Sequence, residues 1–132
     1  MGGLRCWRLP VPNPFPHFDG FTYSAAIPLQ EGVTRRDPSP VIRVDEVYYV
    51  WYSRTTHSVD GYSATVWYAT SDDGHTWSEQ GEALGAGGEG SFHQHAVFTP
   101  TILVASGLYY LFYTAVPEPF TNADGGPGGT RT

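Results

Sequence analysis

The 132-residue sequence predicts an all-β fold that is built from short antiparallel strands. No segment shows the 3.6-residue apolar period of a long amphipathic helix. Instead, β-branched and aromatic residues gather in short runs that are bounded by Gly, Pro, Asp and Ser. One of these runs recurs later in the chain with the same order of residue classes. The recurrence indicates that a unit of sheet structure is repeated.

The expected strands follow the apolar runs in chain order. They are residues 40–44, 47–54, 65–71, 97–104 and 108–115, with a short strand just after Trp77. The text TVWYATSDDGHTW, residues 65–77, has Asp73-Gly74 at its centre. This dipeptide is the strongest short-range signal for a tight hairpin, because Gly adopts positive φ without penalty. We therefore expect the strands on either side of it to pair antiparallel.

The repeat joins residues 41–53, VIRVDEVYYVWYS, to residues 102–114, ILVASGLYYLFYT, which match class for class. Tyr109 follows Tyr48 by 61 residues, somewhat more than the roughly 40 to 50 residues of familiar propeller blades. Both copies are apolar on both faces of the strand, as expected for a strand that lies between two neighbouring blades. The pattern predicts consecutive blades of a β-propeller. A β-sandwich with two similar central strands is the alternative.

Composition narrows the classes of partner. The chain has 13 acidic against 7 basic residues and a net charge of −6, so it carries no electrostatic footprint for nucleic acid or for an anionic membrane. Neutral sugars fit this balance better. The single cysteine, Cys6, excludes an intrachain disulfide framework. No signal peptide and no run of about 18 apolar residues can be read. The compartment and the oligomeric state stay undecided.

Three motifs in order carry a resemblance to a known family. They are RRDPSPVI (35–42) with YYVWYS (48–53), then WYATSDDGHTWSEQGEAL (67–84), then VFTPTILVASGLYYLFYT (97–114). Together, from about Gly32 to Thr121, they resemble the first two blades of the five-bladed β-propeller glycoside hydrolases of family 117 and its relatives near family 43. The resemblance implies an active site at the narrow mouth of the propeller's central channel.

The resemblance also divides the chain. Residues 1–20 are expected to form a Pro-rich N-terminal arm, residues 21–118 the two blades, and residues 119–132 a Gly-rich loop at a truncated end. Because propellers close from about four to eight blades, two blades cannot form a ring. We therefore expect an N-terminal fragment that is inactive and poorly behaved alone. Its acid catalyst and the third carboxylate of the family would lie beyond Thr132.

The function that the resemblance implies is hydrolysis of a poly- or oligosaccharide, and inversion is the expected course. The family's general base maps onto Asp37 of RRDPS. An inverting enzyme needs one carboxylate to activate water and one acid for the leaving oxygen. Arg36 or Arg35 would keep the Asp37 carboxylate ionised, and Pro38 would fix its backbone. Alternatively, Asp37 is an ordinary turn residue, and the chain is a non-catalytic carbohydrate-binding or interaction propeller.

The stretch SFHQHAVFTP, residues 91–100, supplies two further candidates. On an extended segment His93 and His95 would project to the same side, as two sugar contacts or a metal pair would require. We expect both histidines, with Arg36, to bind substrate; polar loop residues are the alternative. Two histidines without a third ligand are too few to indicate a zinc site. We therefore expect neither a metal nor a cofactor.

The remaining polar and aromatic residues of the motifs are expected to have structural roles. Large aromatic side chains inside apolar runs are expected to form blade core rather than sugar-stacking platforms; they are Trp51, Trp67, Tyr49 and Tyr110. The polar residues around the hairpin are expected to be turn residues on the outer edge; they are Asp72, Asp73, His75 and Glu79.

Overall fold

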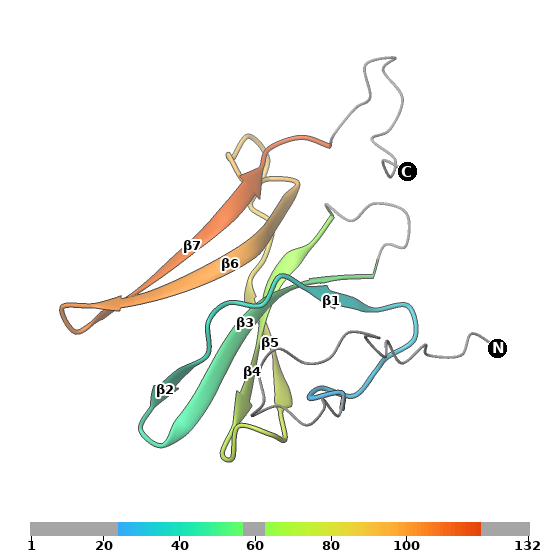
Figure 1. The fold of residues 1–132 in the computed structure, drawn as a ribbon. Coiled ribbons are helices and arrows are strands. Elements are labelled where there is room, and N and C mark those ends of the chain that lie inside the picture. The colour runs from blue at the N-terminus through green and yellow to red at the C-terminus, as the bar shows by residue number, and fades with distance from the viewer. Residues whose placement is uncertain (1–23, 57–62, 120–132) are drawn as a thin grey trace, which may run out of the picture.

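The computed structural model describes residues 24–56 and 63–119, which form seven β-strands in two antiparallel sheets (Figure 1). This part of the chain contains no helix, and so none that could cross a membrane. The all-β prediction is confirmed, and the two sheets are consistent with part of a β-propeller. The expected N-terminal arm, 1–20, and nearly all of the expected C-terminal loop, 119–132, lie outside the described residues.

The first sheet contains five of the strands. They are β1 (Thr34–Arg36), β2 (Ile42–Val44), β3 (Val47–Thr55), β4 (Thr65–Ser71) and β5 (Ser78–Leu84). The strand order is β1-β3-β4-β5, and β2 also pairs with β3. Arg36 lies opposite Ser53, and Ile42 lies opposite Tyr49, so β1 and β2 follow one another along the same side of β3. The sheet is therefore four strands wide, which is the width of a propeller blade.

The second sheet is the hairpin of β6 (Ala96–Ala105) and β7 (Leu108–Val116). Its turn and the β2–β3 turn have the same backbone form. Asp45 and Glu46 have φ values of 45° and 71°, and Ser106 and Gly107 have 52° and 75°. Positive φ at both central residues is the conformation that matches the twist of a two-residue hairpin. Both repeat motifs thus fold into antiparallel hairpins, which agrees with the predicted fold of short antiparallel strands.

The β4–β5 hairpin turns at Asp73-Gly74, where Gly74 has a φ of 75°. The Asp73 carboxylate closes the turn, since its Oδ1 accepts the backbone N–H groups of Thr76 and His75, both at 2.7 Å. These hydrogen bonds hold the pKa of the Asp73 carboxyl well below its usual range. The predicted role of Asp73 as a turn residue is confirmed.

Both faces of the first sheet carry apolar clusters. The face that carries Ser53 packs against β6, and a cluster of Ala64, Ala96, Phe98 and Val116 is buried at the junction. A backbone hydrogen bond of 3.0 Å from Val97 N to Ala64 O links the sheets there. The opposite face, which carries Tyr52, has a second cluster around Val50, Tyr52 and Ala69, against which Ile27, Trp67 and Trp77 pack. We call these the Ser53 face and the Tyr52 face of the first sheet.

Candidate functional site

Asp37 stands at the break between β1 and β2. Its φ is 52°, a left-handed value that is uncommon for a residue other than Gly and most tolerated by Asp and Asn. After Pro38 the chain returns to β3 through Ser39, whose N–H donates to Trp51 O at 2.8 Å and whose Oγ accepts from Trp51 N at 3.0 Å. The break takes Asp37 out of the strand ladder while the residues on both sides of it stay fixed.

The Asp37 carboxylate is held through one of its two oxygens. Oδ2 accepts a hydrogen bond from Ser53 Oγ at 3.2 Å and lies 3.4 Å from Arg36 Nε. Within residues 24–56 and 63–119, no hydrogen bond or ion pair reaches Oδ1. The side chain keeps 35% of its surface exposed. The carboxylate is thus fixed in orientation and still has an oxygen that can accept a proton from water.

Ser53 connects this carboxylate to the second sheet. It is fully buried, and its Oγ accepts the backbone N–H of Thr99 in β6 at 2.8 Å. A hydroxyl has a single proton, so this acceptance leaves the Ser53 proton for Asp37. Sequence reasoning missed Ser53 as a site residue. The available signal was the small hydroxyl residue that ends each repeat motif, Ser53 in one and Thr114 in the other.

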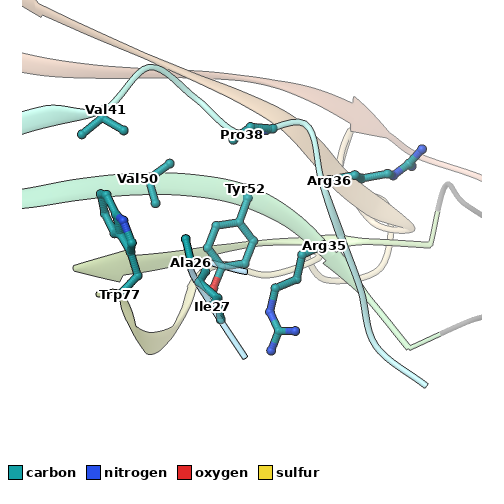
Figure 2. Close-up of a pocket in the computed structure, with 9 residues that line it drawn as sticks. All are labelled: Ala26, Ile27, Arg35, Arg36, Pro38, Val41, Val50, Tyr52 and Trp77. Atoms are coloured by element: carbon teal, nitrogen blue, oxygen red, sulfur yellow. The ribbon is translucent and has the colours of Figure 1, made fainter. Parts of the chain in front are cut away.

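Arg36 and Arg35 have different partners. The Arg36 guanidinium also lies over the Phe98 ring of β6, 5.8 Å from its centroid. Arg35 pairs instead with Glu79, with Nε at 2.7 Å and Nη2 at 3.1 Å from the carboxylate oxygens. Successive residues of a strand point to opposite faces, so only one of the two arginines can lie beside Asp37. Figure 2 shows Arg35 beside Tyr52 and Arg36 directed away from it.

The expected role of Glu79 as a turn residue at the outer edge is wrong. Glu79 lies in β5 opposite Ala69, with 19% of its side chain exposed. Besides the Arg35 bonds it accepts one from Tyr52 Oη at 2.6 Å and lies 3.6 Å from Arg54 Nε. The Arg35 hydrogen bond lowers the pKa of Glu79, and burial followed by the Glu79 hydrogen bond raises the pKa of Tyr52. The network thus consists of the ionised Glu79 carboxylate, two arginine guanidinium groups and the protonated Tyr52 phenol. It links strands β1, β3 and β5.

A pocket of about 310 Å³ opens on the Tyr52 face (Figure 2). Its lining comes from the N-terminal segment, the β1–β2 region, β3 and the β4–β5 turn: Ala26, Ile27, Arg35, Arg36, Pro38, Val41, Val50, Tyr52 and Trp77. Asp37 does not line it, although the residues on both sides of Asp37 do. A sugar site needs several convergent polar groups, and this lining is mainly apolar. The pocket is therefore better suited to apolar side chains than to a saccharide.

The two candidate histidines do not share one side of an extended segment. Residues 89–95 form turns, with hydrogen bonds from Ser91 N to Gly88 O at 3.1 Å and from Gln94 N to Ser91 O at 3.2 Å. The expectation of an extended segment is wrong, because strand β6 begins only at Ala96.

The histidines accordingly have separate neighbours. The His93 ring packs edge-on against the Phe92 ring, with the ring centroids 4.5 Å apart. His95 Nε2 instead lies 3.5 Å from Ser63 Oγ. His93 Nδ1 is buried, with no hydrogen-bond partner in the described part of the chain. No group of three or more His, Cys, Asp or Glu residues that could hold a metal occurs among the described residues. Their role in substrate binding stays a prediction.

The aromatic residues of the motifs differ in burial. Trp51 stacks between Tyr49 and Tyr68, with ring centroids 6.0 and 6.5 Å apart, and these rings are half-buried. Trp67 lies 3.9 Å below the Arg54 guanidinium, also half-buried. These contacts within the first sheet match the expected structural role. Tyr110 differs, since it is exposed on the second sheet.

Comparisons with known proteins were informative at the level of structure. No protein-family model matches the chain, and no curated protein matches it. The structure of Zg3597, a family 117 glycoside hydrolase produced by the marine bacterium Zobellia galactanivorans, does match, with 34% sequence identity and a TM-score of 0.64. The match covers 76% of this chain and 34% of Zg3597, so the chain spans about a third of that enzyme's length. The chain is therefore similar in sequence and fold to part of a family 117 glycoside hydrolase, which confirms the resemblance that its motifs indicated.

Proposed function

We propose that the protein is a glycoside hydrolase that acts on a poly- or oligosaccharide with inversion, and that Asp37 is its general base. The observation that carries the proposal is the Asp37 carboxylate itself. Ser53 and Arg36 hold Oδ2, while Oδ1 is left without a protein partner among the described residues, at a left-handed backbone position. The similarity to Zg3597 supports the same reaction class.

The geometry fits the task of a base. In an inverting hydrolysis a water molecule attacks the anomeric carbon as the base takes its proton, and an acid protonates the leaving oxygen. Asp37 would accept that proton at Oδ1, while the two contacts at Oδ2 keep the carboxylate aimed at the water. The two carboxyl groups of such a pair stand about 6.5 to 9.5 Å apart. The proposal assigns the acid to a carboxyl that follows Thr132 in a longer polypeptide, since the chain spans about a third of the length of Zg3597. Residues 1–132 alone would then be inactive.

Arg36 is proposed to contact the substrate as well as the base. A third of its side chain is exposed, beside the Asp37 carboxylate. Guanidinium groups donate hydrogen bonds in a fixed fork, which suits sugar hydroxyls or a carboxylate on an acidic sugar. His93 and His95 are proposed as further sugar contacts at the entry to β6.

The test is a kinetic comparison in a natural polypeptide that contains this sequence and cleaves a glycoside. Asp37→Asn should lower kcat by about 10² to 10⁴-fold and leave binding of the oligosaccharide largely intact, because a lost base affects the transition state more than ground-state contacts. Asp73→Asn, at the exposed hairpin tip, is the matched control and should keep normal turnover. NMR of the first-formed product reports the anomer.

Two results would contradict the proposal. Normal turnover by the Asp37→Asn variant would remove Asp37 from the mechanism. A wild-type protein that binds oligosaccharides and cleaves none of them would instead identify a non-catalytic carbohydrate-binding propeller.

A further inference from the structure

Asp37 and Thr99 occupy the same place in the two repeats. Both have left-handed backbones, with φ values of 52° and 50°, and both precede a proline. Each also contacts the hydroxyl that ends its own repeat motif: Asp37 Oδ2 lies 3.2 Å from Ser53 Oγ, and Thr99 Oγ1 lies 2.6 Å from Thr114 Oγ1. The second repeat therefore contains its own copy of the arrangement that holds the candidate base.

Thr99 lies in a β-bulge of the β6–β7 hairpin. The register shifts between Phe98 and Thr101, so that two residues of β6, Thr99 and Pro100, lie opposite one residue of β7. Proline has no N–H for the strand ladder, and the Thr99 N–H leaves the ladder to donate to Ser53 Oγ in the first sheet at 2.8 Å. A bulge redirects the groups of the residues that it takes out of the ladder. This bulge directs a backbone donor of the second sheet at the hydroxyl that holds the candidate base.

The backbone of Thr99 is strained. A left-handed φ is uncommon for any residue other than Gly, and it is an outlier for a β-branched residue such as Thr. Such conformations persist only where the surrounding structure holds them, and they gather at functional sites. Thr99 is held at two points, since its N–H bonds to Ser53 and its hydroxyl bonds to that of Thr114. The Thr114 hydroxyl thus helps to keep the Thr99 N–H directed at Ser53.

The Thr99 N–H in turn decides the direction of the Ser53 hydroxyl. Ser53 Oγ accepts this N–H on one side, which leaves its single proton for the Asp37 carboxylate, and the residue is fully buried. A hydroxyl that lost the N–H could turn about its Cβ–Oγ bond, because hydroxyl protons rotate to suit their partners. The candidate base would then lose a fixed hydrogen bond although its own residue had not changed.

We infer that Thr99 is a positioning residue for the candidate base and acts through Ser53. The hydroxyl bond to Thr114 keeps the strained backbone in place, and the Thr99 N–H orients the Ser53 hydroxyl. That hydroxyl then aims the Asp37 carboxylate. The inference rests on the proposed function of Asp37 and deepens it, since the second sheet takes part in aiming the base of the first. Thr99 is not required to touch the substrate or the attacking water.

The test is a kinetic comparison in a natural polypeptide that contains this sequence and cleaves a glycoside. Thr99→Val keeps the β-branched shape and removes the hydroxyl, so kcat should fall about 2 to 10-fold with little change in KM. Thr99→Ser keeps the hydroxyl and should restore turnover. Thr101→Val is the matched control and should have normal turnover, because Thr101 lies in the same strand and its side chain makes no hydrogen bond within the segments that the structure describes.

A double-mutant cycle separates a positioning role from a purely structural one. In a Ser53→Ala background, Thr99→Val should lower kcat much less than in the wild type, because the hydroxyl that Thr99 orients is already absent. A residue that only stabilised the fold would lower kcat by the same factor in both backgrounds. Thr114→Val should match Thr99→Val, and the two together should lower kcat no further than either alone, since both remove the same hydrogen bond. Circular dichroism at the assay temperature verifies that each variant is folded.

The Asp37→Asn variant, measured alongside, distinguishes this inference from the proposed function. Normal turnover of Asp37→Asn would overturn both. An inactive Asp37→Asn together with normal kcat in Thr99→Val would overturn the positioning role alone. Equal losses in the wild-type and Ser53→Ala backgrounds would exclude the route through Ser53. A rise in KM at unchanged kcat would overturn the inference in another way, because it would assign the Thr99 hydroxyl to substrate contact.

Discussion

Replacement of Glu79 by Gln tests the ion network that joins β1, β3 and β5. The Glu79 carboxylate accepts hydrogen bonds from Arg35 at 2.7 and 3.1 Å and from Tyr52 at 2.6 Å, and Arg54 lies 3.6 Å away. Hydrogen bonds to charged groups contribute about 1.5 to 3 kcal/mol each, and Gln preserves the shape and one acceptor. The variant still leaves Arg35 and Arg54, which are 17% and 14% exposed, without their counter-charge.

We therefore expect the free energy of unfolding to fall by about 2 to 4 kcal/mol at pH 7, which corresponds to roughly 8 to 16 °C in Tm. The effect depends on pH. The folded pKa of Glu79 is lowered from its ordinary value of 4.5, so its contribution is present above that pH and is lost as the pH falls through the folded pKa. The difference between wild type and variant should be largest near neutrality and should shrink below pH 4.5.

Urea unfolding followed by tryptophan fluorescence measures this difference at pH 7 and pH 3. Glu46→Gln is the control, because Glu46 also pairs with an arginine, Arg43, yet is 87% exposed. Exposed pairs contribute about 0 to 1 kcal/mol. Equal losses for the two variants at pH 7, or a Glu79→Gln effect that persists in full at pH 3, would refute the reasoning.

Two further substitutions test the position of Asp37 and the hairpin. In an active parent enzyme, Ser53→Ala should lower kcat about 10-fold or more with little change in KM. The substitution removes the hydrogen bond to the Asp37 carboxylate and leaves the Thr99 N–H without its acceptor. Ser53→Thr keeps the hydroxyl and should restore activity. An equal loss in both variants would assign Ser53 a purely structural role. Gly74→Ala should destabilise the chain by about 1 kcal/mol in thermal unfolding, because the φ of 75° disfavours a side chain, and no loss would contradict this.

The sequence by itself determined the strands and their pairing in hairpins. The expected strands 47–54, 65–71, 97–104 and 108–115 became β3, β4, β6 and β7, within a residue or two of the expected bounds. Gly74 placed the β4–β5 turn, and each copy of the repeated motif became an antiparallel hairpin. These features depend on residues that are close in the chain. Local propensity and the alternation of side chains act at this range, so pattern reasoning can find them.

Strand β1 and the role of Glu79 needed the tertiary structure. Strand β1, residues 34–36, forms because its backbone pairs with that of β3. Three residues are too few to show the alternation of apolar and polar side chains that would predict a strand. The text SEQGEAL of β5 is too polar to be recognised as half-buried. Its Glu79 is kept ionised inside the sheet by Arg35, which lies 44 residues away in the sequence.

The candidate site shows the same division. The motif RRDPS identified Asp37 from the sequence. The alternation of side chains along a strand required Arg35 and Arg36 to point to opposite faces. Only the packing of the sheets decided which of the two arginines lies beside the Asp37 carboxylate. The contact between Ser53 and Thr99 spans 46 residues and crosses from one sheet to the other. Residues this far apart in the sequence meet only when whole sheets pack, because burial of the apolar faces supplies the free energy that brings them together. The residues that lie between them in the sequence carry no local pattern from which this contact could be predicted.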